Sequence, residues 1–344
     1  MAERGRTTVY NKIVTEEKLA QINKENITLM NDFLDYLKSV DRAKTTVDAY
    51  WHDLTIFWCW NLTENNNKFF VDMNKREFAR FQNYGLNQLG WSSNRVRRMK
   101  STLSSLSNYL ENICDDIYED YRPIVRKIES PVNEPVREKT VVSDEDLQKL
   151  LNTLVERKQY QRACAVSLAM CCGCRKAELT RFKVSFFTDE NIIFGGIYKT
   201  PEKIKTKGRG KVKFLNKYIL VEFKKYFDLW MNERLEQGIE SEWLFVSKDE
   251  NGYKQAGTSL LDGWTSEFSE ILGAPFYYHM LRHYVITRFR KMNIPSNVIV
   301  EWVGWSDESM IVIYDDSEAI DDFGKYFTPE GIVKQDEKSL SDLK

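Results

Sequence analysis

Apolar positions along the first third of the chain recur every three or four residues, which is the spacing of amphipathic α-helices. The pattern runs from Glu17 to Ile113 and is clearest at its end. There, one apolar stripe is formed by Val96, Met99, Leu103, Leu106, Leu110 and Ile113. The periodicity predicts a helical domain over residues 17–119, preceded by an N-terminal arm at residues 1–16.

The periodic pattern then stops. Pro123, Pro131 and Pro135 interrupt a stretch of mixed charge, which predicts an extended linker over residues 120–140. Helical order resumes at Ser143, which precedes three acidic residues in the manner of a helix start. Residues 141–344 are therefore predicted to form a second domain.

This second domain combines helices with one β-rich insertion. Residues 185–215 are rich in Phe, Ile and Val and are broken by glycines, which predicts a small antiparallel sheet. Helices are expected over residues 164–172, 218–231, 258–271 and 279–292, and a short one from Pro295 to Gly304. The predicted fold class is mainly α, with a helical domain followed by an α+β domain.

Composition narrows the class of protein. The 344 residues are 42% hydrophobic and 13% aromatic, which is enough for two cores. The chain has no apolar run of about 18 residues and no signal peptide, so we expect no membrane span. Six cysteines without a secretion signal predict reduced thiols and a cytoplasmic location. The cluster Cys171-Cys172-Gly173-Cys174 lacks a second ligand group, so we expect no metal site.

The net charge of −1 hides an asymmetry, because residues 301–344 hold 12 acidic residues and 4 lysines. That segment carries −8, which leaves +7 for residues 1–300. Basic residues cluster near residues 95–100 and 199–213, where they form either solvated faces or phosphate-facing surfaces. The candidate DNA contacts are Arg95, Arg97, Arg98, Lys100, Lys203, Arg209 and Lys211.

The residue types that carry chemistry lie near the C-terminus. His279, Arg282 and His283 are spaced i, i+3 and i+4, so a helix places them on one face. Trp305 follows a glycine, and Tyr314 comes nine residues after Trp305. Arginine forks bind phosphate oxygens, and indole donates a hydrogen bond without acid–base behaviour. Such a set suits the holding of a phosphodiester while a phenol attacks it.

These segments resemble the signature of the tyrosine recombinase, or phage integrase, family. His279-Met-Leu-Arg282-His283, Val303-Gly304-Trp305-Ser306 and Tyr314 match H-x-L-R-H, L-G-H/W-S and the tyrosine nine residues on. Cys172 to Leu179 is similar to the T-G-x-R-x-x-E-L box, and Thr46 to Tyr50 is similar to a core-binding segment. Most members have histidine where Trp305 stands, although Cre recombinase also has tryptophan.

The resemblance implies a site-specific DNA recombinase that forms a 3′-phosphotyrosine intermediate and needs neither metal nor ATP. Arg175 and Arg282 would clamp the scissile phosphate, with Trp305 beside them. Tyr314 would be the nucleophile, and His279 would take its proton or bind the phosphate. Glu178 would orient the first arginine and the histidine.

Two roles stay open at this stage. The family's catalytic lysine lies on a β-hairpin, where Lys205-Thr206 resembles one form of its motif and Lys207-Gly208 another. We favour Lys205 slightly and keep Lys207 as the second candidate. His283 either lines the site or packs beside it.

The expected partner is double-stranded DNA carrying recombination sites. A homotetramer on paired sites would be held together by the tail Glu318–Lys344, in a nucleoid-associated enzyme of a mobile element or similar programme. Two alternatives are a monomeric type IB topoisomerase and a DNA-binding protein that has lost catalysis. The complete set of candidate catalytic residues and the helical first half argue against both.

Overall fold

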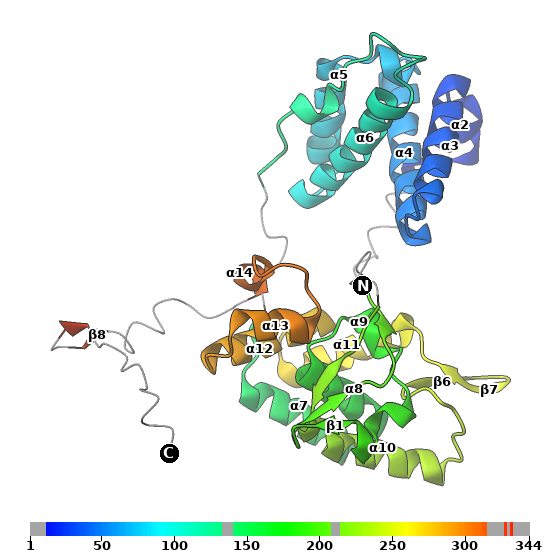
Figure 1. Ribbon diagram of the computed structural model, residues 1–344. Coiled ribbons are helices and arrows are strands. Elements are labelled where there is room, and N and C mark those ends of the chain that lie inside the picture. Colours follow the sequence, from blue (N-terminus) through cyan, green and yellow to red (C-terminus); the bar gives the residue numbers. More distant parts are fainter. Residues whose placement is uncertain (1–11, 133–139, 208–213, 315–326, 329–330, 333–344) are drawn as a thin grey trace. The chain divides into compact units, whose positions relative to one another are not determined.

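The computed structural model describes residues 12–132, 140–207, 214–314, 327–328 and 331–332. The chain divides into two compact units, Met1–Glu138 and Lys139–Lys344, which are both drawn in Figure 1. The two units correspond to the helical and the α+β halves expected from the sequence pattern. The predicted fold class is therefore confirmed.

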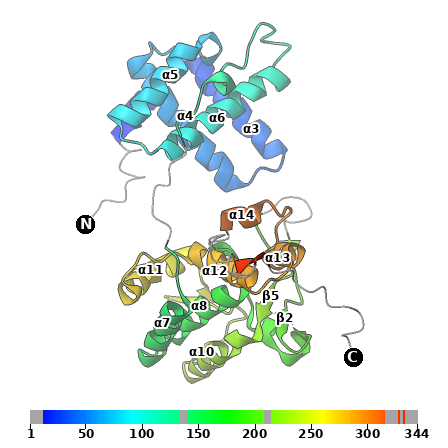
Figure 2. The same ribbon diagram turned by 90° about the vertical axis from the view of Figure 1, so that its left-hand side faces the viewer.

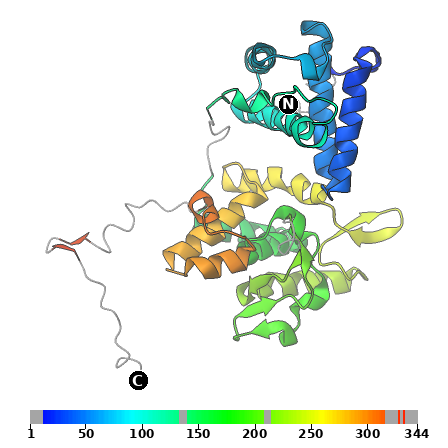
Figure 3. The ribbon, with the colours of Figure 1, turned by 45° about the horizontal axis from the view of Figure 1, so that its top comes forward.

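The N-terminal unit is a helical bundle in which each long helix buries one face. Its α-helices are α2 (Glu16–Gln21), α3 (Lys24–Ser39), α4 (Lys44–Glu64), α5 (Lys75–Asn83) and α6 (Ser93–Ile113). Short helical turns add η1 (Phe70–Asp72), η2 (Tyr84–Gln88) and η3 (Val125–Lys127). Helices α3, α4 and α6 pack together (Figure 3), with Leu54, Phe57 and Leu106 fully buried.

Local sequence fixes where these helices begin. Asn74 and Glu77 form a capping box at α5, and the Ser92 hydroxyl accepts the backbone N–H of Arg95 at the start of α6. Five of the six residues in the predicted stripe of α6 are buried, whereas Ile113 is exposed at its end. The helix therefore lies with the face that the periodicity predicts toward the core.

Residues 120–132 were expected in the linker, but they pack on the N-terminal unit. The Val125 side chain is buried in its core, and the hydroxyls of Tyr121 and Ser107 lie 2.7 Å apart. Ile13 and Val14, from the predicted arm, are buried there as well. Apolar residues between the prolines supply this packing, which proline and charge counts alone do not reveal.

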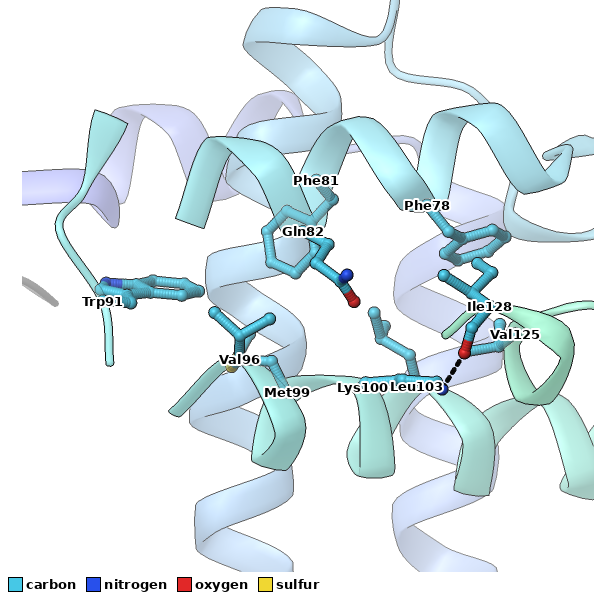
Figure 4. A pocket seen from close by; sticks show the side chains of 10 residues that line it. All are labelled: Phe78, Phe81, Gln82, Trp91, Val96, Met99, Lys100, Leu103, Val125 and Ile128. Carbon is cyan, nitrogen blue, oxygen red and sulfur yellow. Dashed lines mark hydrogen bonds between the residues drawn. The ribbon is translucent and has the colours of Figure 1, made fainter. Parts of the chain in front are cut away.

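Figure 4 shows how this segment closes a small apolar pocket between α5 and α6. Phe78 and Phe81 of α5 line one side, and Ile128 lies beyond the end of η3. The Lys100 ammonium donates to the Ile128 carbonyl and lies 3.0 Å from the Ser130 hydroxyl oxygen. Lys100 thus ties the segment after η3 to α6.

The C-terminal unit is built around one apolar helix. Its α-helices are α7 (Asp144–Glu156), α8 (Tyr160–Cys172), α9 (Lys176–Leu179), α10 (Lys224–Glu236), α11 (Thr258–Leu272), α12 (Tyr278–Lys291), α13 (Ser296–Val303) and α14 (Met310–Tyr314). Helix α8 contacts α7, α10 and α12 (Figure 2). Because neighbours cover it on several sides, α8 is apolar nearly all round.

Short strands and turns complete this unit. They are η4 (Val184–Phe187), η5 (Asp189–Asn191), β1 (Ile192–Ile193), β2 (Ile197–Lys199), β3 (Ile204–Lys205), β4 (Phe214–Leu215), β5 (Tyr218–Leu220), η7 (Val221–Phe223), β6 (Val246–Asp249), β7 (Gly252–Gln255), β8 (Phe327–Thr328) and β9 (Gly331–Ile332). Antiparallel pairs join β1 to β2, β2 to β5, and β3 to β4. The small sheet expected from the sequence is therefore present.

In this region one sequence prediction fails and one element was not predicted. The helix expected over 218–231 is wrong at its start, because Tyr218–Leu220 forms β5 and the helix begins at Lys224. Pairing with β2 and full burial of Ile219 override the helical spacing. The β6–β7 hairpin, which projects from the unit in Figures 1 and 3, has polar strands with little apolar alternation and was not predicted.

The remaining expectations concern cysteines and membrane. All six cysteines are buried and free of disulfides. Within the described residues, no cluster of three or more His, Cys, Asp or Glu side chains has the arrangement of a metal site. None of the described helices combines the length and hydrophobicity that a bilayer crossing requires.

Candidate active site

The first part of the site is the turn that joins α8 to α9. Gly173 ends α8 with φ of 62°, and a Cβ at this position would lie 3.2 Å from Cγ1 of Val285. Glycine therefore lets α8 stop against α12 and places Arg175 at the start of α9. The Arg175 side chain is 26% exposed, so its guanidinium remains open to a ligand.

Arg282 of α12 lies beside this turn and is fully buried. Its Nη1 donates to the carbonyl of Gly173 at 2.8 Å, and its Nη2 donates to the carbonyl of Val303 at 3.0 Å. Its Nε has no partner among the described residues. One guanidinium thus joins the end of α8 to the end of α13.

The end of α13 is a second glycine turn. Gly304 has φ of 71°, and a Cβ there would lie 2.6 Å from Cδ1 of Leu215, closer than real side-chain contacts come. The turn directs Trp305 inward, where the Arg282 guanidinium carbon lies 5.0 Å from the centre of the indole ring. The indole N–H is buried without a partner in the described part of the chain.

Tyr314 ends α14, which contacts α12 (Figure 2). Its hydroxyl oxygen lies 3.0 Å from Nε2 of His279. The His283 ring stacks on the Tyr314 ring with centroids 4.5 Å apart, and Trp305 packs on another side at 4.9 Å. The phenol is therefore oriented by three aromatic neighbours and aimed at an imidazole nitrogen. His283 therefore packs against the Tyr314 ring.

A buried ion cluster lies behind Arg175. Glu178 accepts from Nη1 of Arg175 at 3.2 Å, and its other oxygen lies 2.7 Å from Nζ of Lys217. The Glu178 and Lys217 side chains are each 1% exposed. Glu178 therefore contacts Arg175 and Lys217, and the hydrogen bonds and ion pairs of Glu178 in the described residues do not include His279. Its expected role in orienting Arg175 stays a prediction.

Comparison with known proteins identifies the family to which this chain belongs. Residues 140–319 match the phage integrase family, and residues 29–120 match the phage integrase N-terminal SAM-like domain. The SPbeta prophage-derived recombinase-like protein YomM of Bacillus subtilis (strain 168) is 30% identical over 278 residues, which are 80% of this chain and 81% of that protein. The chain belongs to the phage integrase family. It is a tyrosine site-specific recombinase.

Solved structures of two integrases and of a site-specific recombinase share the fold. A lambda integrase (75–356) dimer bound to a COC′ core site has a TM-score of 0.62 and 14% identity, covering 85% of this chain and 95% of that one. The Tn1549 transposon integrase in complex with circular intermediate DNA has a TM-score of 0.60 and 13% identity, covering 86% and 98%. XerH bound to difH has a TM-score of 0.59 and 16% identity, covering 85% and 82%.

In this integrase, the electrostatics of the site favour a neutral imidazole. Desolvation, followed by the charges of His283 and Arg282, lowers the pKa of His279 to about 4. His279 is nevertheless exposed, so a bound phosphate has access to it. At neutral pH the imidazole is therefore uncharged, and Nε2 can accept from the Tyr314 hydroxyl in the tautomer that carries its proton on Nδ1.

The two arginines remain cationic. Burial, followed by the charge of Arg175, lowers the pKa of Arg282 to about 10, still well above neutral pH. Burial would raise the pKa of Glu178, but the Lys217 ammonium and then Arg175 outweigh it, so the pKa of Glu178 is lowered. The site thus presents fixed positive charge to an anion.

The two lysine candidates of the hairpin differ in their surroundings. Lys207 is among the charges that lower the pKa of His279. The backbone carbonyl of Lys205 accepts from Nη1 of Arg181 at 2.7 Å, and its side chain extends from β3 into solvent. The choice between Lys205, which the sequence slightly favours, and Lys207 stays a prediction. Lys203 is exposed beside β3, whereas Arg209 and Lys211 lie outside the described residues.

The basic residues at the start of α6 all have partners within their own unit. Arg98 forms an ion pair with the buried Asp53, and the Arg95 guanidinium lies 4.6 Å from the Trp91 ring centre. Arg97 donates to the carbonyl of Pro131 at 2.8 Å, and Lys100 is held as described above. Their proposed role in DNA binding stays a prediction, and for Arg98 the structure adds a role in the core.

Lys217 was not predicted as a site residue from the sequence. Its position between an asparagine and a tyrosine carries no motif, and its neighbours in the chain do not distinguish it from the other lysines of this segment. Only the fold reveals that it is buried against Glu178.

Proposed function

We propose that this recombinase cleaves one DNA strand by attack of the Tyr314 hydroxyl oxygen on phosphorus. The observation that carries the proposal is the 3.0 Å separation between that oxygen and Nε2 of His279. A bond forms between the phenolic oxygen and phosphorus, and the bond from phosphorus to the 5′ oxygen breaks. The phenolic proton passes to His279, which leaves a 3′-phosphotyrosine and a free 5′-hydroxyl.

Arg175, Arg282 and Trp305 would bind the non-bridging oxygens of that phosphate. Arg175 has an accessible guanidinium, and the unpartnered N–H groups of Arg282 Nε and Trp305 Nε1 are buried donors. Buried donors without partners are costly in a folded protein, so an anionic ligand is a natural acceptor for them. Fixed donors around the phosphorus stabilise the charge that builds up in the transition state.

Lys207 is the proposed general acid for the leaving 5′ oxygen. Its charge acts on His279, so it belongs to the same electrostatic environment as the attacking group. The covalent intermediate conserves the energy of the phosphodiester, so strand rejoining by a second 5′-hydroxyl requires no ATP.

The relatives support a proposal for the assembly and the setting of the reaction. Solved neighbours include a lambda integrase tetramer bound to a Holliday junction, and the sequence relative is derived from a prophage. We propose that this chain acts as a homotetramer on two paired recombination sites of a mobile element, in the nucleoid. The tail Glu318–Lys344, proposed to link the subunits, lies outside the described residues except for β8 and β9.

Tyr314→Phe tests the nucleophile. The variant should form no covalent adduct with a nicked suicide DNA substrate, while its affinity for a half-site stays within about twofold, because the phenol contributes chemistry and not affinity. Tyr218→Phe is a matched control, since that hydroxyl bonds the exposed Glu301 instead. An adduct formed by Tyr314→Phe would overturn the assignment. Strand joining between two sites distinguishes recombination from simple nicking and closing.

Lys207→Ala and Lys205→Ala test the general acid. Only the first should slow cleavage, by about 100-fold. Replacing the leaving 5′ oxygen with sulfur should restore the rate of Lys207→Ala, because a thiolate leaves without a proton. Equal effects of the two substitutions would contradict the choice of Lys207.

A further inference from the structure

Lys217 is a further lysine near the site, and its surroundings differ from those of the hairpin lysines, Lys205 and Lys207. It lies between β4 and β5 with its side chain 1% exposed, whereas Lys205 and Lys207 are exposed. A lysine is seldom buried to this extent unless it is paired. Its ammonium nitrogen lies 2.7 Å from Oε2 of Glu178.

The backbone of Lys217 is fixed at the base of the lysine hairpin. Its N–H donates to the Thr200 hydroxyl at 2.9 Å, and its carbonyl accepts the Thr200 N–H at 2.9 Å. The Asn216 side chain also donates to the Thr200 carbonyl at 2.6 Å. Thr200 directly follows β2, which pairs with β5, so these bonds close the segment that carries Lys205 and Lys207.

The side chain of Lys217 reaches two further parts of the site. Through Glu178 it contacts the carboxylate that braces Arg175. A Cβ on Gly304 would lie 3.7 Å from its Nζ, so the ammonium lies under the turn that directs Trp305 inward. Lys217 therefore contacts Thr200 through its backbone and Glu178 through its ammonium group, and that ammonium group lies close to Gly304.

We propose that Lys217 is a positioning residue for cleavage, which acts by holding Glu178 as an ionised carboxylate in the orientation that braces Arg175. The inference rests on the proposed function of Arg175 as a phosphate ligand. Arg175 and Lys217 both contact the Glu178 carboxylate. The Arg175 guanidinium lies closest to Oε1, and the Lys217 ammonium lies closest to Oε2. Removal of Lys217 leaves a buried carboxylate with one partner, which favours its protonation and loosens Arg175.

The charged groups around Glu178 define the expected pH behaviour. Arg175 and Lys217 bind it directly, Arg282 of α12 interacts with it electrostatically, and the Cys174 thiol lies on the same turn. Lys217 is the largest influence that lowers the pKa of Glu178. Without it, the pKa of Glu178 rises, so the carboxylate protonates as the pH falls through a higher value than in the wild-type protein.

The test is a double-mutant cycle with Lys217→Met and Glu178→Gln, measured as single-turnover cleavage of a nicked suicide substrate. Lys217→Met should slow cleavage about 10- to 100-fold at pH 7 and recover partly as the pH rises. In the Glu178→Gln background, the same substitution should change the rate less than about threefold, because its effect passes through the carboxylate. Half-site binding and melting temperature are recorded for every variant.

Arg234→Met is the matched control for loss of a buried cation. Arg234 is buried in the same unit, but it binds backbone carbonyls such as that of Trp243 and lies outside the site. The Arg234→Met substitution should lower the melting temperature without changing the pH profile of cleavage. If Lys217→Met alone does not fold, the double variant with Lys217→Met and Glu178→Gln is compared with Glu178→Gln alone. The double variant leaves no unpaired carboxylate buried at this position.

Each outcome decides the inference. Equal rate losses in both backgrounds, a pH profile parallel to that of the wild-type protein, or cleavage at the wild-type rate would overturn the positioning role of Lys217 and leave the proposed function intact. A double variant much slower than Glu178→Gln would also overturn it. A wild-type protein that forms no adduct would instead overturn the proposed function, and this inference with it.

Discussion

At the scale of single residues, the two arginines of the site are held in different ways. Arg282 is fully buried and joins two backbone carbonyls from α8 and α13, so it is part of the core as well as of the site. Arg175 is partly exposed and is braced by one carboxylate. Arg282 is therefore expected to contribute to stability as well as to the chemistry of the site, whereas Arg175 is expected to contribute mainly to the chemistry.

Arg282→Ala and Arg175→Ala should both lower the cleavage rate by at least about 100-fold, since each removes a charged donor to the transition state. Only Arg282→Ala should also lower the free energy of unfolding by about 2–4 kcal/mol, because it leaves two buried carbonyls without donors. Cleavage assays together with urea denaturation measure both effects. Arg288→Ala is the control on the same helix, since its partner Glu222 is exposed. Equal free energies of unfolding for Arg282→Ala and Arg175→Ala would contradict the stabilising role assigned to Arg282.

At the scale of secondary structure elements, α6 shows how a basic face can serve the fold. Arg98 neutralises Asp53, whose side chain is 2% exposed and also accepts from the Thr102 hydroxyl. Arg97 is exposed and contacts one backbone carbonyl. A cluster of positive charge along a helix therefore does not by itself mark a phosphate-binding surface.

Arg97→Ala and Arg98→Ala separate the two uses of this face. If Arg97 contacts a phosphate, its removal should reduce the slope of log affinity against log salt by about 0.9, with little change in melting temperature. Arg98→Ala should instead lower the free energy of unfolding by about 1–3 kcal/mol, because Asp53 loses its guanidinium partner. Half-site binding at several salt concentrations gives the slopes. An unchanged slope for Arg97→Ala would leave that residue with its Pro131 contact alone.

At the scale of the whole molecule, charge is divided along the chain. The 44 residues from Glu301 onward carry −8, while residues 1–300 carry +7. Acidic residues that follow Tyr314, the proposed nucleophile, disfavour contact with DNA, which supports the proposal of a protein partner for the tail. Three aromatic residues, Phe323, Tyr326 and Phe327, give that segment apolar surface to bury.

Truncation after Asp322 tests the proposed role of the tail in assembly. Binding to a single half-site should be retained, whereas cooperative filling of a full site should weaken, because the apolar contact with a second subunit is lost. Gel shifts with half-sites and full sites measure the two. A lowered melting temperature with unchanged cooperativity would mean that the tail packs on its own subunit, and the intersubunit role would be wrong.

Local periodicity and spacing were sufficient for much of this protein. His279, Arg282 and His283 share a face of α12 because a helix repeats every 3.6 residues. The caps at Ser143 and Gly304 fix the ends of their helices through backbone geometry that only neighbouring residues influence. The helical first unit, the small sheet and the family of the chain were therefore predictable from sequence.

Contacts between distant segments decided the rest. Tyr218–Leu220 became a strand because β2 offers a hydrogen-bonding edge, although its local spacing is helical. Lys205 and Lys207 are nearly indistinguishable by sequence, and the effect of the Lys207 charge on the pKa of His279 appears only in the folded chain. Lys217 acquired its place from burial against Glu178, 39 positions earlier in the chain. Burial and pairing across such separations depend on the assembled core, and no local pattern of residues encodes them.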